Sequence, residues 1–279
     1  MEVIIEEGIC TLCGRRTRVA LLECWEDQDR GVVEMNVTLC ATCLTHILQR
    51  MEGNWRNKDG KEGGGMFTDL ELIAYKKQRK AVKNFFENDL GYLPDRYVNV
   101  MFGSKRNIFY HPKGYFYVDV FFSKLEFSHD VYFGEEPGKG RLELEYPTIT
   151  LADVVLEKLQ IHEINRKDLI DLTVLFLGHE LSEEDKRGFI NAKYIARVLA
   201  DDWGFWYDAV NNLNKVKLFV KKATEEGKIK KDESETIIAR IDRLLEYIDK
   251  EPKTKNWVKR STFLSKSKIL IFFHRVNLH

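Results

Sequence analysis

Apolar residues follow two different periods along this chain, and the change between them separates a strand-rich middle from a helical second half. Between Tyr97 and Tyr146, short apolar runs are separated by turns, several of which contain glycine, a pattern typical of β-strands. The expected strands are, in chain order, YVNVMF (97–102), YFYVDVFF (115–122), EFSHDVYF (126–133) and RLELEY (141–146). Together they predict a small sheet that is mixed or mostly antiparallel.

After these strands the apolar positions recur every three or four residues as far as about Lys250, which predicts helices. The first would start at Thr150, because Thr150 and Asp153 have capping-box spacing. The second would be capped by Asn165 and would end at Gly178. The stretch INAKYIARVLADDWGFWYDAVNNLNKVKLFV predicts one or two further helices. The stretch DESETIIARIDRLLEYIDK predicts a clearly amphipathic helix.

A stretch rich in glycine and charge, GNWRNKDGKEGGGM, lies ahead of the strands. It is expected to be a linker or a mobile loop beside a site. A helix is predicted to start directly after it at Thr68, because Thr68 and Glu71 have capping-box spacing. The apolar stripe of this helix would consist of Leu72, Tyr75, Val82, Phe85 and Phe86.

All five cysteines lie within the first 43 residues. Cys10 and Cys13 form one pair, and Cys40 and Cys43 another, each with the two-residue gap that lets both thiolates face one ion. Four such thiolates predict a closed, structural zinc site, and the pattern resembles a treble-clef zinc finger with a hairpin between its pairs. Disulfides or reduced thiols are the alternatives, and Cys24 is expected to be a small buried side chain.

The overall charge favours no class of partner, because 44 Lys and Arg residues balance 44 Asp and Glu residues. No apolar run reaches the roughly 20 residues that span a bilayer, so no membrane partner is expected. The acidic N-terminus, MEVIIEEG, is unlike a signal peptide, and we expect a cytoplasmic protein.

The residues that suit nucleotide chemistry lie between positions 103 and 119. Gly103 would let the backbone approach a phosphate, and Ser104 could donate a hydrogen bond. Lys105 and Arg106 would supply positive charge. Asp119 falls within the next predicted strand, where a rigid carboxylate could hold Mg²⁺.

A second group of charged residues lies on the predicted helices. The neighbours of Lys158 one turn away are largely apolar, so its ammonium must be paired, used in a site, or extended to the surface. Asp168 and Asp171 share a helix face, and they could hold Lys158 or Lys167, or act as a general base on an incoming hydroxyl. Asp168 could also simply belong to the first turn of its helix.

Four of these stretches resemble the nucleotidyltransferase-fold superfamily, in the group near the AbiEii toxin-like and minimal nucleotidyltransferase proteins. They are FGS followed by VDVF, then TITLADVVLEKLQ, NRKDLIDL and DDWGFWYD, within about Thr68 to Lys217. The resemblance implies Mg²⁺ at Asp119, with NTP phosphates at Gly103, Ser104, Lys105 and Arg106. It also implies accessory roles for Lys158 and Asp168.

One position departs from the resemblance. The superfamily usually has a second acid two residues after the first, and here that position is Phe121. Because one carboxylate holds a divalent ion poorly, a partner acid is expected from a neighbouring strand. The candidates are Glu126, Asp130, Glu143 and Glu145, of which Glu143 is favoured as a catalytic residue.

The C-terminal tail is basic and aromatic, and we expect it either to contact RNA or DNA or to cover the core as a last strand or helix. Its cations are Lys253, Lys255, Lys259, Arg260, Lys266, Lys268 and Arg275, and its aromatic residues are Trp257, Phe263, Phe272 and Phe273. For His111, His129 and the WGFWYD stretch, a surface or core role is favoured over a ligand or base-stacking role.

These patterns predict an α+β fold: a small mixed sheet with helices of nucleotidyltransferase type, a helical region and an N-terminal zinc finger. The expected divisions are a zinc module (1–53), a linker (54–66), a nucleotidyltransferase-like domain (67–180), a helical region (181–250) and a tail (251–279). The expected function is Mg²⁺-dependent transfer of a nucleoside monophosphate from an NTP to RNA, protein or a small acceptor, in the manner of such toxins. The alternative is a catalytically degenerate adaptor that binds nucleic acid or a protein partner through the zinc finger and tail.

Overall fold

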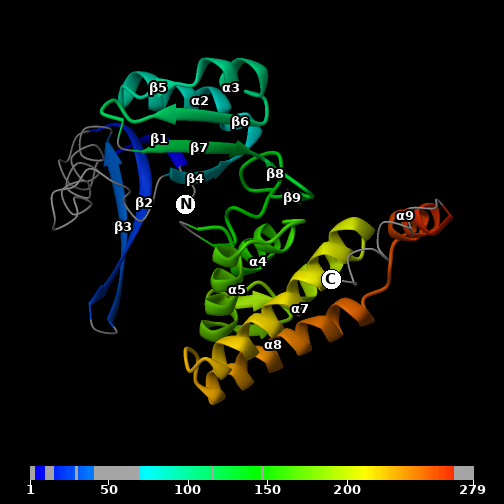
Figure 1. Cartoon of the computed structure of the whole chain (residues 1–279). Coiled ribbons are helices and arrows are strands. Elements are labelled where there is room, and N and C mark those ends of the chain that lie inside the picture. The colour runs from blue at the N-terminus through cyan, green and yellow to red at the C-terminus, as the bar shows by residue number, and fades with distance from the viewer. Residues whose placement is uncertain are drawn as a thin grey trace. The chain divides into compact units, whose positions relative to one another are not determined.

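The computed structural model describes residues 4–9, 16–28, 31–40, 69–114, 116–145 and 148–266 (Figure 1). The chain divides into two compact units. The first unit consists of Met1–Leu125 and Tyr132–Ile149, and the second of Glu126–Val131 and Thr150–His279. The six residues Glu126–Val131 therefore pack with helices that follow them in sequence. No helix in the described ranges is both long and apolar enough to cross a membrane.

The N-terminal strands β1 (Ile4–Ile9), β2 (Arg16–Gln28) and β3 (Gly31–Cys40) form an antiparallel sheet in that order. Gln28 pairs with Gly31, so β2 and β3 make the hairpin expected between the two cysteine pairs. Cys40 ends β3. Cys10, Cys13 and Cys43 lie outside the described residues, as does the linker 54–66, so the zinc site stays a prediction.

A mixed four-stranded sheet forms the centre of the first unit, as the sequence predicted in outline. Its strands are β4 (Asp69–Ala74), β5 (Leu93–Pro94), β6 (Arg106–Tyr110) and β7 (Tyr117–Phe122), in the order β4-β7-β6-β5. β4 runs parallel to β7, whereas β6 is antiparallel to both β7 and β5. Two short strands, β8 (Lys124–Glu126) and β9 (Asp130–Tyr132), form a separate pair.

The two faces of this sheet differ in chemistry because side chains alternate along each strand. One face carries Val118, Val120 and Phe109, which are buried, and Phe109 stacks on Phe86 with ring centroids 4.8 Å apart. Phe86 belongs to the π-helical turn η2 (Phe85–Asp89), which follows η1 (Lys76–Gln78) and α2 (Arg79–Asn84). The opposite face carries Asp119 together with Ile108 and Phe121, and all three are buried, so this carboxylate is enclosed among apolar side chains.

The prediction that a helix starts at Thr68 is wrong, because Asp69–Ala74 forms strand β4 instead. Leu72, Ile73 and Ala74 are all buried. Consecutive buried residues are typical of a strand that is covered on both faces, whereas an amphipathic helix buries only one stripe. Helical structure begins only at Lys76, and the later part of the predicted stripe, which includes Phe86, does pack on the sheet.

The prediction of a strand at YVNVMF is also wrong, because this segment forms helix α3 (Arg96–Met101). Asp95 caps it by accepting a hydrogen bond of 2.8 Å from the Val98 amide, and this local cap outweighs the β-propensity of the valines. Residues 141–145 of RLELEY form turns rather than a strand. EFSHDVYF is interrupted by a bend between β8 and β9.

Helices dominate the second unit (Figure 1). They are α4 (Leu151–Leu159), α5 (Arg166–Gly178), α6 (Ala192–Leu199), α7 (Trp203–Glu225), α8 (Lys231–Lys250) and α9 (Lys255–Lys266). The predicted caps are confirmed: the Thr150 hydroxyl accepts from the Asp153 amide at 3.3 Å, and Asn165 accepts from the Lys167 amide at 2.7 Å. A parallel pair, β10 (Glu180–Ser182) and β11 (Phe189–Asn191), was not predicted.

Candidate functional site

Asp119 lies on strand β7 and is only 2% exposed. Nε of Arg106 donates to both carboxylate oxygens, at 2.7 and 2.9 Å, and Nη2 also contacts Oδ2. This bonding to Asp119 raises the pKa of Arg106. The Arg106 side chain is 36% exposed, so one end of the ion pair is buried and the other reaches solvent.

Glu71 on β4 occupies the position paired with Asp119 on β7. Side chains at paired positions of neighbouring strands point to the same face, so the two carboxylates are neighbours across the sheet. The charge of Glu71 also contributes to the raised pKa of Arg106. The sequence prediction missed Glu71 because it placed this residue in a helix; an interpretation of DLELIA as a strand would have found it.

The Gly103–Ser104–Lys105 segment is the turn that ends α3 and leads into β6. A Cβ atom on Gly103 would lie 2.1 Å from the carbonyl oxygen of Asn99, so only glycine fits this close approach to the helix. The Lys105 amide donates to the Phe102 carbonyl at 2.8 Å. The turn therefore follows a helix, whereas the sequence pattern placed it after a strand, and Arg106 is the first residue of β6.

Glu143, the favoured second acid, lies on the loop after β9 and not on a strand. Its Oε2 accepts a hydrogen bond from the Tyr75 hydroxyl, and its Oε1 accepts one from the Gly138 amide at 2.8 Å. The Tyr75 hydroxyl in turn accepts from the Leu142 amide at 3.1 Å. Three other acids were candidates for the second metal ligand. Glu126 and Asp130 belong to the second unit, and Glu145 is the last residue of the described range 116–145.

Lys158 in the second unit lies among three carboxylates. Its Nζ is 3.5 Å from Asp168, 3.5 Å from Asp171 and 3.6 Å from Glu157. Burial raises the pKa of Glu157. Oδ2 of the buried Asp168 makes no hydrogen bond with the described part of the chain. Asp168 and Asp171 therefore form ion pairs with Lys158, which is one of the roles expected for them from the sequence.

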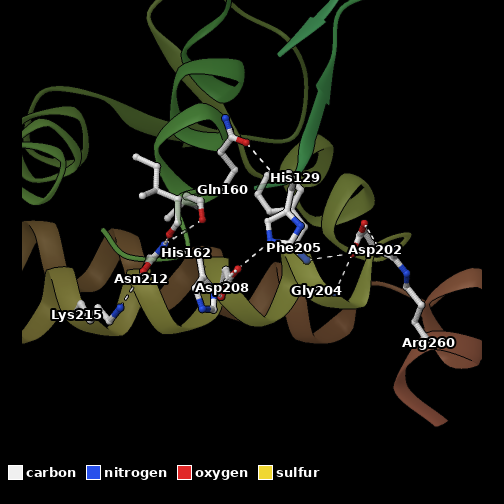
Figure 2. A network of polar contacts seen from close by, with 12 residues as sticks. His129, Gln160, His162, Asp202, Gly204, Phe205, Asp208, Asn212, Lys215 and Arg260 are labelled. Atoms are coloured by element: carbon white, nitrogen blue, oxygen red, sulfur yellow. Dashed lines mark hydrogen bonds and ion pairs between the residues drawn. The ribbon is translucent and has the colours of Figure 1, made fainter. Parts of the chain in front are cut away.

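A network of two histidines around Asp208 occupies the second unit (Figure 2). Oδ2 of Asp208 lies 2.8 Å from Nε2 of His129, and Oδ1 lies 2.9 Å from Nδ1 of His162. Burial opposes the ionised form, but the hydrogen bonds of the two histidines hold the pKa of Asp208 below its ordinary value. From the sequence, His129 was expected on the surface or in the core, and neither His162 nor Asp208 was expected to form a site.

The remaining aromatic candidates have packing roles. The WGFWYD stretch begins helix α7, where Phe205 is buried and the rings of Trp203 and Tyr207 stack 5.5 Å apart. His111 is buried and makes an edge contact with Tyr92. The WGFWYD stretch was expected to be a core helix and His111 to be a surface or core residue, and the buried Phe205 and His111 fit these expectations.

Helix α9 gives the basic tail an ordered first part. Its residues Lys255–Lys266 include no acid. Trp257 of α9 makes an edge contact with Trp206 of α7, and Arg260 pairs with Asp202 at 2.8 Å. The tail thus begins as a helix that packs on α7, which matches the core-covering alternative for this part. Lys268, Phe272, Phe273 and Arg275 lie outside the described residues.

Among the residues that the structure describes, no group of three or more histidine, cysteine, aspartate or glutamate side chains is arranged to hold a metal ion. The chain matches no protein-family model, no curated protein and no solved structure. The resemblance to the nucleotidyltransferase-fold superfamily therefore rests on short sequence motifs alone.

Proposed function

We propose that the protein is a Mg²⁺-dependent nucleotidyltransferase that moves a nucleoside monophosphate from an NTP to an RNA, protein or small-molecule acceptor. The observation that carries this proposal is the pairing of Glu71 with Asp119 on adjacent parallel strands of a small mixed sheet. The pairing supplies the second carboxylate that the Asp119 strand itself lacks, since Phe121 occupies the expected position.

The donor set fits Mg²⁺ bound together with a nucleotide. This ion takes oxygen ligands and commonly uses one or two protein carboxylates, with water and substrate phosphates completing its octahedral shell. Asp119 and Glu71 would hold the ion, which would neutralise charge on the triphosphate. Arg106 binds both oxygens of Asp119 in this structure, so metal binding requires Arg106 to release at least one of them.

Three groups close to this face can act on the triphosphate. Arg106 is a part-exposed cation whose planar fork suits phosphate as well as carboxylate. Ser104 and Lys105 lie in the turn immediately before it. The accessory roles that the resemblance implies for Lys158 and Asp168 stay predictions, since the ion pair of these residues forms entirely within the second unit.

The test uses the purified full-length protein with each α-³²P-labelled NTP, Mg²⁺ or Mn²⁺, and total RNA. Label transfer that is lost in both Asp119→Asn and Glu71→Gln supports the proposal. Glu143→Gln is the matched control, because the carboxylate of Glu143 is bonded to Tyr75 and Gly138, and this variant should retain transfer. Absence of transfer, together with absence of NTP binding by calorimetry, would contradict the proposal.

A second candidate function is a non-enzymatic adaptor, and the closed Arg106–Asp119 pair is the observation that favours it. A guanidinium that stays on both carboxylate oxygens would leave no room for a metal ion. Binding would then fall to the zinc-finger segment, with nucleic acid or protein as the partner, and to the basic helix α9.

Binding measurements with nucleic acid and with NTP distinguish the adaptor from the nucleotidyltransferase. The adaptor predicts RNA or DNA binding that weakens with added salt and that is reduced by Lys255→Glu with Lys259→Glu on α9. It also predicts no NTP binding in the wild-type protein. Mg²⁺-dependent NTP binding that disappears in Asp119→Asn would instead exclude the adaptor as the complete function.

A further inference from the structure

The network around Asp208 fixes which nitrogen of His162 carries a proton. Asp208 accepts from His162 Nδ1 at 2.9 Å and from His129 Nε2 at 2.8 Å. An ionised carboxylate can only accept hydrogen bonds, so both of these ring nitrogens must be donors. In neutral His162 the proton is therefore on Nδ1, and Nε2 keeps its lone pair.

The two histidines differ sharply in their access to solvent. The His162 side chain is 68% exposed, whereas that of His129 is 13% exposed and that of Asp208 10%. A buried carboxylate thus orients one exposed imidazole and one enclosed imidazole. Only His162 is accessible to a reagent or substrate from solution.

The backbone that carries His162 is held by the same face of α7. Asn212, one turn after Asp208, is fully buried, and its side-chain amide donates to the carbonyls of Leu159 at 3.1 Å and Ile161 at 2.7 Å. Asp208 and Asn212 therefore fix the ring and the backbone of His162 together (Figure 2). Such a double attachment holds a side chain in one orientation.

His129 in turn holds the carboxylate in place. Its ring stacks on Phe205 with centroids 5.0 Å apart and planes within 5°. A Cβ atom at Gly204 would lie 3.1 Å from His129 Cε1, so the absence of a side chain there permits the close approach. With one oxygen bonded to His129, Asp208 is held in position to orient His162.

We propose that Nε2 of His162 is a phosphoryl-accepting site, modified by a small phosphoryl donor with a good leaving group. The Nε2 lone pair forms the bond to phosphorus, and the bond to the leaving group breaks, with its electron pair departing on that group. The proton stays on Nδ1, where the Asp208 carboxylate balances the positive charge of the substituted ring.

A cation lies on the same stripe of α7 and favours an anionic donor. Lys215 is seven residues after Asp208, which places both on one helix face, and its Nζ is 3.4 Å from Oδ1 of Asn212. Figure 2 shows the three side chains following one another along α7. The inference is independent of the nucleotidyltransferase proposal, because all of its residues belong to the second unit.

The chain contains a matched reference for His162. Nδ1 of His179 lies 3.0 Å from the carbonyl oxygen of Gly188, so His179 has the same tautomer, with a neutral acceptor in place of a carboxylate. A difference in reactivity between His162 and His179 therefore reports on Asp208 and Lys215 together, and the Asp208→Asn and Lys215→Gln variants separate the two contributions.

The experiment treats the full-length protein with potassium phosphoramidate and follows phosphohistidine at each site by mass spectrometry under conditions that preserve it. His162 should be labelled about tenfold faster than His179, since a hydrogen bond to a charged acceptor is stronger than one to a neutral acceptor. Asp208→Asn should lower the His162 rate toward that of His179 and leave His179 unchanged. Lys215→Gln should lower the His162 rate alone.

Equal labelling of His162 and His179 in the wild-type protein would overturn the proposal, and so would an unchanged His162 rate in a folded Asp208→Asn protein. If Asp208→Asn does not fold, the comparison within the wild-type chain still decides. Acylation of His162 by diethyl pyrocarbonate without phosphorylation would also contradict it, because the imidazole would then be accessible but not phosphoryl-accepting.

Discussion

Arg106 and Asp119 hold each other across the sheet from diagonal rather than paired positions. Asp119 is paired with Ile108, and Arg106 is paired with Phe121, so the long arginine side chain reaches obliquely to the carboxylate. On the way its guanidinium carbon lies 5.2 Å from the centre of the Phe121 ring. Phe121 thus supports the arginine that neutralises Asp119.

Arg106→Met should lower the free energy of unfolding by about 3 kcal/mol, because it removes the charged partner of a buried carboxylate and keeps most of the aliphatic packing. Urea unfolding followed by circular dichroism measures this difference. Arg96→Met is the control, since Arg96 is exposed on α3, and it should change stability by less than about 0.5 kcal/mol. Equal effects of the two substitutions would show that the Arg106–Asp119 pair contributes little to stability.

Gly103→Ala should destabilise the first unit by more than about 1 kcal/mol, because the new methyl group would meet the Asn99 carbonyl oxygen and force the end of α3 to move. Gly178→Ala at the end of α5 is the matched control. A Cβ there meets no atom within 4 Å, and alanine should be neutral or stabilising by up to about 1 kcal/mol. Thermal unfolding of both variants tests the contrast, which a comparable loss in each would contradict.

Glu157→Gln should stabilise the protein at pH 7. Burial raises the pKa of Glu157, so the folded state holds this proton more tightly than the unfolded chain and loses stability as pH rises above the ordinary glutamate pKa of about 4.3. Glutamine does not titrate and avoids that loss, while Lys158 keeps Asp168 and Asp171 as partners.

Urea unfolding of Glu157→Gln at several pH values follows this effect. The advantage over the wild type should be largest at pH 7 and should disappear near pH 4. Glu163→Gln, at an exposed position, is the control and should have little effect at either pH. A loss of stability at pH 7 in Glu157→Gln would show that the attraction of Lys158 outweighs the burial of the carboxylate.

The sequence predicted those parts of the fold that depend on neighbouring residues. The caps at Thr150 and Asn165 involve partners three residues away or fewer, and both helix starts were correct. Strand β4 was mistaken for a helix because its identity depends on pairing with β7, 48 positions later in the register Glu71–Asp119. Helix α3 was mistaken for a strand because its apolar residues are exposed, so their spacing did not mark a buried face.

The candidate sites could be predicted only in part for the same reason. Asp119 and Lys158 could be singled out because each stands among apolar neighbours in the sequence. The partners of Asp119 come from other strands, and nothing in the sequence around Glu71 or Arg106 specifies the pairing. For Lys158, by contrast, the sequence did offer Asp168 and Asp171 as partners, and both lie 3.5 Å from its Nζ. The contacts of Asp208 span 46 residues to His162 and 79 to His129, which residue spacing along one helix or strand cannot reveal.

Asp208→Asn should destabilise the second unit at neutral pH and have little effect in strong acid. Because the pKa of Asp208 is lowered in the folded state, its stabilising contribution is complete above the ordinary aspartate pKa of about 3.9 and is lost as pH falls through the folded-state value. At pH 7 the expected loss is about 2 kcal/mol, from charge-assisted hydrogen bonds to two histidines.

Among the histidine variants, His129→Gln should cost most of this amount, since His129 is enclosed and stacked on Phe205, whereas His162→Gln should cost less because its ring is exposed. Chemical unfolding at pH 7 and pH 3 measures all three variants, and a loss for Asp208→Asn that is the same at both pH values would contradict the assignment.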